Sequence, residues 1–190
     1  MRLASIVLSA VCLTSAPPVT QYRGTLGAPE TFRVTAQVKG EPGVAAAAIQ
    51  VVIQRYTPEA ERTAIENALE TGGYPAFLIA LRNSSDVGYV EHGTSKFTIR
   101  YARESKTGTG RTIDVVTDRP IYFLGGGEPD AKPRAGFEVA VLRLEIDDIG
   151  FGSGEMAAAA RLKPAPGGGV QIDDYGDAPI KLVTVTRKTS

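Results

Sequence analysis

The chain has 190 residues, with 21 Lys plus Arg against 21 Asp plus Glu, one His, one Cys and no Trp. A net charge near zero provides no basic field for nucleic acid, so we expect no nucleic-acid partner. The length fits a short leader and a single domain that can be stabilised by its core alone.

The first residues have the layout of a secretory signal peptide. Arg2 supplies a positive charge, Leu3–Val11 is a short apolar run, and small residues follow up to Ala16. The run is too short to cross a bilayer, and no later run reaches 18 apolar residues, so we expect no transmembrane segment. The sequence therefore predicts an exported protein, periplasmic or extracellular.

The predicted signal peptide covers residues 1–16, with cleavage between 16 and 28, and a flexible segment follows over 17–29. Cys12 is the last residue of a lipobox-like Ser9–Cys12, but Val11 stands where a small residue is expected, which argues against lipid anchoring. Because cleavage removes Cys12, the mature chain is expected to have no disulfide.

The mature chain begins with two predicted strands. Apolar and polar residues alternate over Phe32–Lys39, which is typical of a half-buried strand. Gly40–Gly43 predicts a turn, and Val44–Arg55 predicts a second strand. The alanine run inside it, Ala45–Ala48, also fits a helix, but β-branched residues follow it directly and favour a strand.

A helical pattern follows. Thr57-Pro58-Glu59 is typical of a helix start, with Thr57 as the N-cap. Gly72-Gly73 predicts its end and Pro75 the start of a second helix. We therefore expect a two-helix hairpin inserted over 58–83, packed over one opening or face of the sheet through four apolar side chains: Ile65, Leu69, Phe77 and Leu81.

From Asp86 onward the pattern is a β meander with turns every 8–15 residues. The sequence therefore predicts a mainly β domain over 30–190: an antiparallel β-barrel or curved β-sandwich of about eight to nine strands. Apolar residues change parity between Val141 and Leu142, which indicates either a β-bulge or a strand buried on both faces.

Two groups of residues resemble a family of uncharacterised secreted bacterial proteins. The first group is Arg55–Arg62 together with Gly72–Ala76 and Val87–Tyr89, and the second is the hairpin Arg143–Met156. The resemblance covers most of residues 48–187. Since the family has no assigned activity, it implies no site residues.

Residues for metal or nucleophilic chemistry are scarce. His92 is the only histidine, which is too few for a typical zinc site, and it has no Gly-x-Ser-x-Gly motif to accompany it. Ile-Asp-Asp occurs at 146–148 and at 172–174, each followed by Gly, which favours tight turns over a calcium loop. Gly125–Gly127 lacks the Gly-Lys-Ser/Thr of a phosphate loop. We expect no metal, no cofactor and no catalytic residue.

The residue types that remain favour binding. Tyr89, Phe97, Tyr101 and Tyr122 fall on or near consecutive predicted strands, with Arg100 among them, and are the candidate ligand-binding residues. The sequence predicts a secreted or periplasmic, non-enzymatic binding or interaction module, with an apolar small molecule or a protein as the partner. The alternative is a hydrolase with a carboxylate site built from Asp147, Asp148, Asp173 or Asp174.

Overall fold

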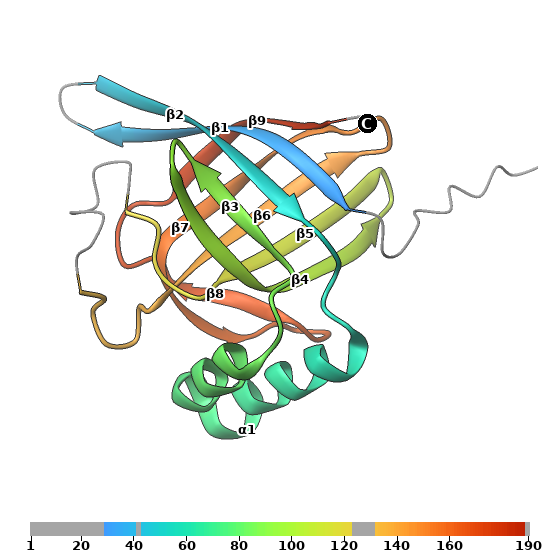
Figure 1. The fold of residues 1–190 in the computed structure, drawn as a ribbon, viewed down its shortest axis with the longest axis vertical. Coiled ribbons are helices and arrows are strands. Elements are labelled where there is room, and N and C mark those ends of the chain that lie inside the picture. Colours follow the sequence, from blue (N-terminus) through green and yellow to red (C-terminus); the bar gives the residue numbers. More distant parts are fainter. Residues whose placement is uncertain (1–28, 41–42, 123–131, 189–190) are drawn as a thin grey trace, which may run out of the picture.

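The computed structural model describes residues 29–40, 43–122 and 132–188. The predicted signal peptide with Cys12, nearly all of the segment 17–29, and Gly125–Gly127 lie outside the described residues. Within them the chain forms one helix and nine strands (Figure 1). These are β1 (Glu30–Gly40), β2 (Gly43–Ile53), α1 (Glu59–Asn83), β3 (Gly88–His92), β4 (Ser95–Thr107), β5 (Gly110–Thr117), β6 (Val139–Asp147), β7 (Phe151–Pro164), β8 (Val170–Asp174) and β9 (Ile180–Arg187).

Eight of the strands close into an antiparallel barrel. Neighbours pair in the order β6-β5-β4-β3-β2-β1-β9-β7, and a further pairing of β6 with β7 closes the ring. β8 is an extra strand that pairs with the end of β7. The prediction of a mainly β, antiparallel fold is confirmed, and of the two architectures it is the barrel that forms. No helix in the described ranges is long and apolar enough to span a membrane.

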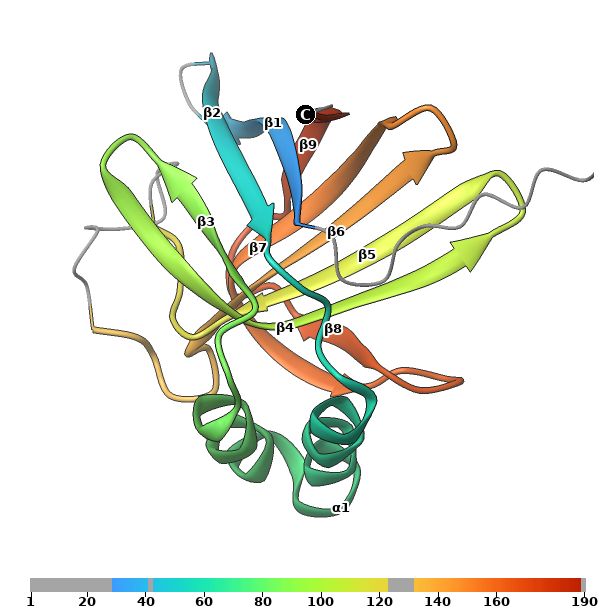
Figure 2. The same ribbon diagram turned by 45° about the vertical axis from the view of Figure 1, so that its right-hand side comes forward.

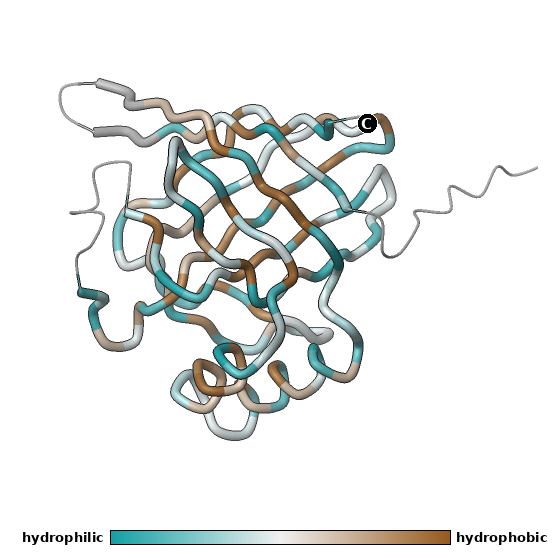
Figure 3. The backbone as a smooth tube through the Cα atoms, in the orientation of Figure 1, coloured by the Kyte–Doolittle hydropathy of each residue, from teal (hydrophilic) through white to brown (hydrophobic). Residues whose placement is uncertain are grey.

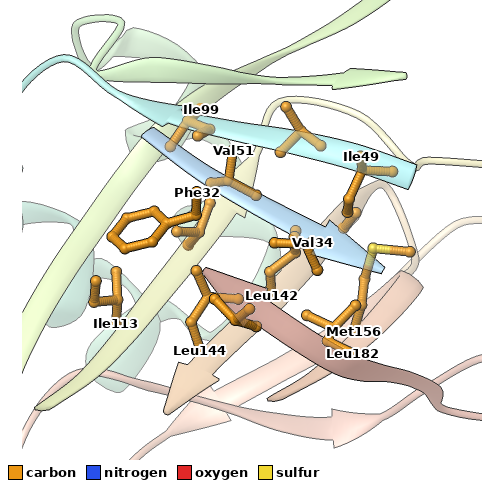
Figure 4. Packing of buried hydrophobic residues seen from close by; sticks show 14 of the residues in the cluster. Phe32, Val34, Ile49, Val51, Ile99, Ile113, Leu142, Leu144, Met156 and Leu182 are labelled. Atoms are coloured by element: carbon orange, nitrogen blue, oxygen red, sulfur yellow. The ribbon is translucent and has the colours of Figure 1, made fainter. Parts of the chain in front are cut away.

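The barrel interior is filled by its own side chains. In most of the barrel strands, residues that point inward alternate with residues that point outward. Hydrophobic and hydrophilic stretches alternate along much of the tube in Figure 3. The inward residues pack into one cluster, in which Phe32, Ile113, Leu142, Leu144 and Met156 are almost completely buried (Figure 4). An eight-stranded barrel has an interior just wide enough for such a core.

A second apolar cluster lies outside the barrel. There α1 and β8 cover the outer faces of β4 to β7, as Figure 2 shows from the side. All four predicted docking residues of the helix, Ile65, Leu69, Phe77 and Leu81, are buried in this cluster, which confirms that part of the prediction.

This second cluster explains the parity change in β6. Leu142 and Leu144 face the interior, whereas Val139 and Val141 face α1, so the strand is buried on both faces. The register shift nearby lies in β7, where Val139 pairs with Ala160 but Val141 pairs with Ala157.

The predicted two-helix hairpin is wrong: the structure has a single helix, α1, bent within its length. The break falls at the predicted diglycine, where Gly73 has φ 66° and ψ −166°. Glycine adopts this left-handed conformation without a steric penalty. Because only one residue departs from helical geometry, the helix resumes directly, with Pro75 inside it.

The helix also starts differently from the prediction. Its N-cap is Pro58 rather than Thr57. The Thr57 side chain accepts a hydrogen bond from the Ala102 amide (2.8 Å), and the Thr57 amide donates to the Ala102 carbonyl (2.9 Å). Thr57 therefore ties the approach to the helix to the middle of β4.

Candidate functional sites

The predicted ligand-binding residues lie on both faces of the sheet. Phe97 faces the barrel interior, whereas Tyr101 is buried on the outer side under α1. A register shift between Ile99 and Tyr101 separates them, so an even spacing in sequence does not place their side chains on one face. The Tyr101 hydroxyl donates to Glu66 Oε1 on the helix at 2.8 Å.

The other three predicted residues are also apart. The Lys96 ammonium lies 4.4 Å from the centre of the Tyr89 ring. Arg100 binds Asp86 (2.7 Å) and donates to the Ser84 carbonyl (2.6 Å). Tyr122 follows β5. Burial and the charge of Asp177 raise its pKa above the ordinary value, and they outweigh the opposite effect of Arg134. The five residues therefore do not converge on one point.

The carboxylates of the hydrolase alternative lie at two separate places, where β6 leads into its turn and at the end of β8. Asp147 Oδ1 accepts the amides of Ile149 (3.1 Å) and Phe151 (2.8 Å), and Asp174 Oδ1 accepts that of Gly176 (2.9 Å). Asp173 pairs with Lys163 at 3.1 Å. Elsewhere burial raises the pKa of Asp118, a carboxyl that the sequence did not single out. No group of three His, Cys, Asp or Glu in the described ranges is placed to hold a metal ion.

A polar cluster that the sequence prediction missed lies at one end of the barrel. Arg111 makes a bidentate ion pair with Glu30, at 2.9 and 3.0 Å, and Tyr56 donates to the same carboxylate at 2.6 Å. Glu104 binds Arg111 at 3.3 Å and Arg187 binds Glu30 at 3.1 Å. We call these five residues the Glu30 cluster.

The Glu30 cluster balances its own charges. Burial of Glu30 (7% exposed) raises its pKa, but hydrogen bonds from Arg111 and Tyr56 outweigh burial and lower the pKa below its ordinary value. Burial and the bond to Glu30 raise the pKa of Tyr56, so its hydroxyl stays protonated. The negative charges of two carboxylates balance the positive charges of two guanidiniums. The cluster is therefore a neutral polar layer beside the apolar core.

Strand parity could have revealed this cluster. Glu30 is in phase with inward Phe32, and Arg111 is in phase with inward Ile113. A charged residue in phase with the apolar positions of a strand, at its end, marks a polar layer at the barrel opening. The pairing between these charges depends on β1 and β5, which are far apart in sequence, and sequence alone does not give it.

Opposite charges also line up across the outside of the barrel. The strand register places Arg103 beside Asp114, Asp114 beside Arg143, Arg143 beside Glu155, and Glu155 beside Lys181. One pair is close, with 2.7 Å between Arg143 Nε and Asp114 Oδ1. Opposite charges on neighbouring strands stabilise this register and disfavour a slip, so the row has a structural role.

The β6–β7 turn presents two apolar side chains to solvent. Ile149 is 80% exposed and Phe151 is 54% exposed. The backbone beneath them is fixed: Asp147 accepts three amides of the turn, and the Gly150 carbonyl accepts the Arg187 amide at 2.8 Å. Gly150 has φ 93°, which favours glycine there. A rigid turn therefore holds two apolar groups in water.

Comparison with known protein families, curated proteins and solved structures finds no match to this chain. The fold and the geometry of these sites therefore carry the functional argument. The resemblance to secreted bacterial proteins stays a prediction.

Proposed function

We propose that this protein is a secreted or periplasmic, non-enzymatic interaction module that binds a partner protein through the β6–β7 turn. The observation that carries the proposal is the exposure of Ile149 and Phe151 on a backbone fixed by hydrogen bonds. Large apolar side chains in water cost free energy, which burial against a partner recovers. A fixed backbone also reduces the entropy lost on binding.

The charges around the turn favour a protein over a lipid surface. Glu145 and Asp148 are exposed on the strand end and turn that carry the two apolar side chains, whereas Arg187, whose side chain lies against Gly150, forms an ion pair with Glu30. Anionic lipid headgroups repel acidic side chains, whereas basic residues around a pocket of a partner protein attract acidic side chains. The partner we propose therefore has an apolar pocket with a basic rim.

Because side chains fill the barrel interior, we place the binding site on the outer surface. An apolar small molecule inside would have to displace side chains such as Phe32 and Leu144, which are buried in the core. The hydrolase alternative would need carboxylates that converge, and Asp147 and Asp174 instead hold separate turns.

We expect Phe151→Ser and Ile149→Ser to weaken partner binding by about tenfold or more, the loss when a buried apolar anchor is truncated. A photo-reactive residue in place of Ser153, which is exposed two residues after Phe151, identifies the contacting protein in cells that export the protein. Titration of that purified protein measures the dissociation constants. Val183→Ser is the matched control, because Val183 is 40% exposed on β9. Equal affinity of both turn variants and the wild type would disprove the proposal.

Export is tested separately by the intact mass of the protein outside the cytoplasm. We expect a mass from which residues 1–16 at least, and Cys12 with them, are missing, because the leader has the layout of a cleaved signal peptide. A mass that retains Cys12, with or without lipid, would overturn the export proposal as stated here.

A further inference from the structure

The guanidiniums of two arginines lie over one buried phenyl ring at the edge of the barrel. The guanidinium carbon of Arg134 lies 3.8 Å from the centre of the Phe137 ring, and that of Arg161 lies 5.0 Å from it. Phe137 itself is only 4% exposed, whereas both arginines are exposed. We call these three residues the Phe137 clamp.

The backbone holds the Phe137 clamp in place. The Phe137 amide donates to the Arg134 carbonyl at 2.9 Å, which closes a tight turn before β6. Gly136 has φ 88° in this turn, and a Cβ there would lie 3.2 Å from a guanidinium nitrogen of Arg161. The Arg161 head group, from β7, therefore lies against the turn that carries Arg134.

Within the described residues, both guanidiniums keep hydrogen-bond donors available. A cation–π contact with an aromatic ring does not take up all five N–H donors of a guanidinium. Neither Arg134 nor Arg161 makes a side-chain hydrogen bond or ion pair with another residue in the described ranges. This differs from Arg100, Arg111 and Arg143, which each bind a carboxylate.

Acidic groups also lie near the clamp. Asp174 lies opposite Arg161 in the β7–β8 ladder, but its Oδ1 accepts the Gly176 amide. Asp177 and Glu138 act on the Tyr122 hydroxyl, as does Arg134. The charge of Arg134 therefore acts on Tyr122, one of the predicted ligand-binding residues.

We propose that the Phe137 clamp is an anion-binding site that takes a phosphate group. Guanidiniums bind phosphate oxygens in a bidentate manner, and two of them match the charge of a dianion. Both lie within 5.0 Å of one ring centre, so a single phosphate at the edge of the clamp can reach both. The site is separate from the β6–β7 turn, and its test does not depend on the proposed function.

The test is calorimetric titration of the full exported protein with inorganic phosphate and with phenyl phosphate, at constant ionic strength. Cosedimentation with phosphatidylcholine vesicles containing phosphatidic acid shows whether a lipid phosphate is bound instead. We expect Arg134→Gln and Arg161→Gln each to weaken phosphate binding by about tenfold or more, the contribution of a hydrogen bond to a charged group. Phe137→Leu keeps both charges and should also weaken binding, because it removes the ring that orients them.

Arg33→Gln, at an exposed position on β1, is the matched control and should bind as the wild type does. Circular dichroism melts verify that each variant is folded at the titration temperature. Binding in any phosphate arm that is lost in both clamp variants but not in the control supports the site. No binding in all three arms, or equal binding by wild type and both clamp variants, overturns it.

Discussion

Phe77→Ala should lower the free energy of unfolding by about 3–5 kcal/mol, the usual cost of removing a fully buried phenyl ring. Phe77 is 0% exposed and lies in the cluster that joins α1 to the outer faces of β4 to β7. It follows the break at Gly73, so the second arm of the helix depends on it for docking. Urea melts followed by circular dichroism measure the change, since the chain has no Trp for fluorescence.

Ile79→Ala is the matched control for this variant. Ile79 is in the same arm of α1 but is 64% exposed, so its loss should change stability by only about 0.5 kcal/mol or less. If Phe77→Ala cost no more than Ile79→Ala, the helix would not be docked through its buried side. The slope of each melt also shows whether the helix detaches before the barrel unfolds.

The strands of this fold could be predicted because their signals are local. Alternation over Phe32–Lys39 and the turn residues Gly40–Gly43 mark β1 and β2 without reference to the rest of the chain. The closing pair β6–β7 follows from a short turn around Gly150. The sequence could not decide between a barrel and a sandwich. That choice depends on long-range pairings such as that of β1 with β9, which lie at opposite ends of the domain sequence.

Side-chain direction was harder to predict than strand position. A single register shift between Ile99 and Tyr101 sends Phe97 and Tyr101 to opposite faces of β4. One extra residue in a strand reverses the face of every residue after it. The helix followed the same rule: the diglycine was found from sequence, but whether it ends α1 or only bends it depends on packing against the barrel.

Glu30→Ala should be the most destabilising single change at the barrel end, at about 3–5 kcal/mol, because it leaves a buried guanidinium without its main partner. Arg111 is 12% exposed and binds Glu30 through two nitrogens. The same change removes the acceptor of the Tyr56 hydroxyl and a partner of Arg187. Asp173→Ala, which breaks the exposed pair with Lys163, is the control and should cost about 1 kcal/mol or less.

The double variant Glu30→Leu with Arg111→Met separates two quantities. One is the net contribution of the ion pair to stability, and the other is the free-energy cost of leaving one buried charge unpaired. Replacing both partners of a buried pair by apolar residues is often close to neutral, so the double variant should be more stable than Glu30→Ala alone. A double variant as unstable as Glu30→Ala would mean that the barrel end needs the hydrogen bonds of the Glu30 cluster themselves.

Acid unfolding gives an independent measure of the same cluster. Since the folded state lowers the pKa of Glu30 from its ordinary 4.5, the ionised carboxylate stabilises the fold. This contribution is complete above the unfolded pKa and is lost as the pH falls through the lower, folded pKa. Glu30→Gln cannot titrate, so its stability should fall less steeply than that of the wild type below pH 4.5. Urea melts over that range measure both slopes, and parallel curves would show that Glu30 carries no such linkage.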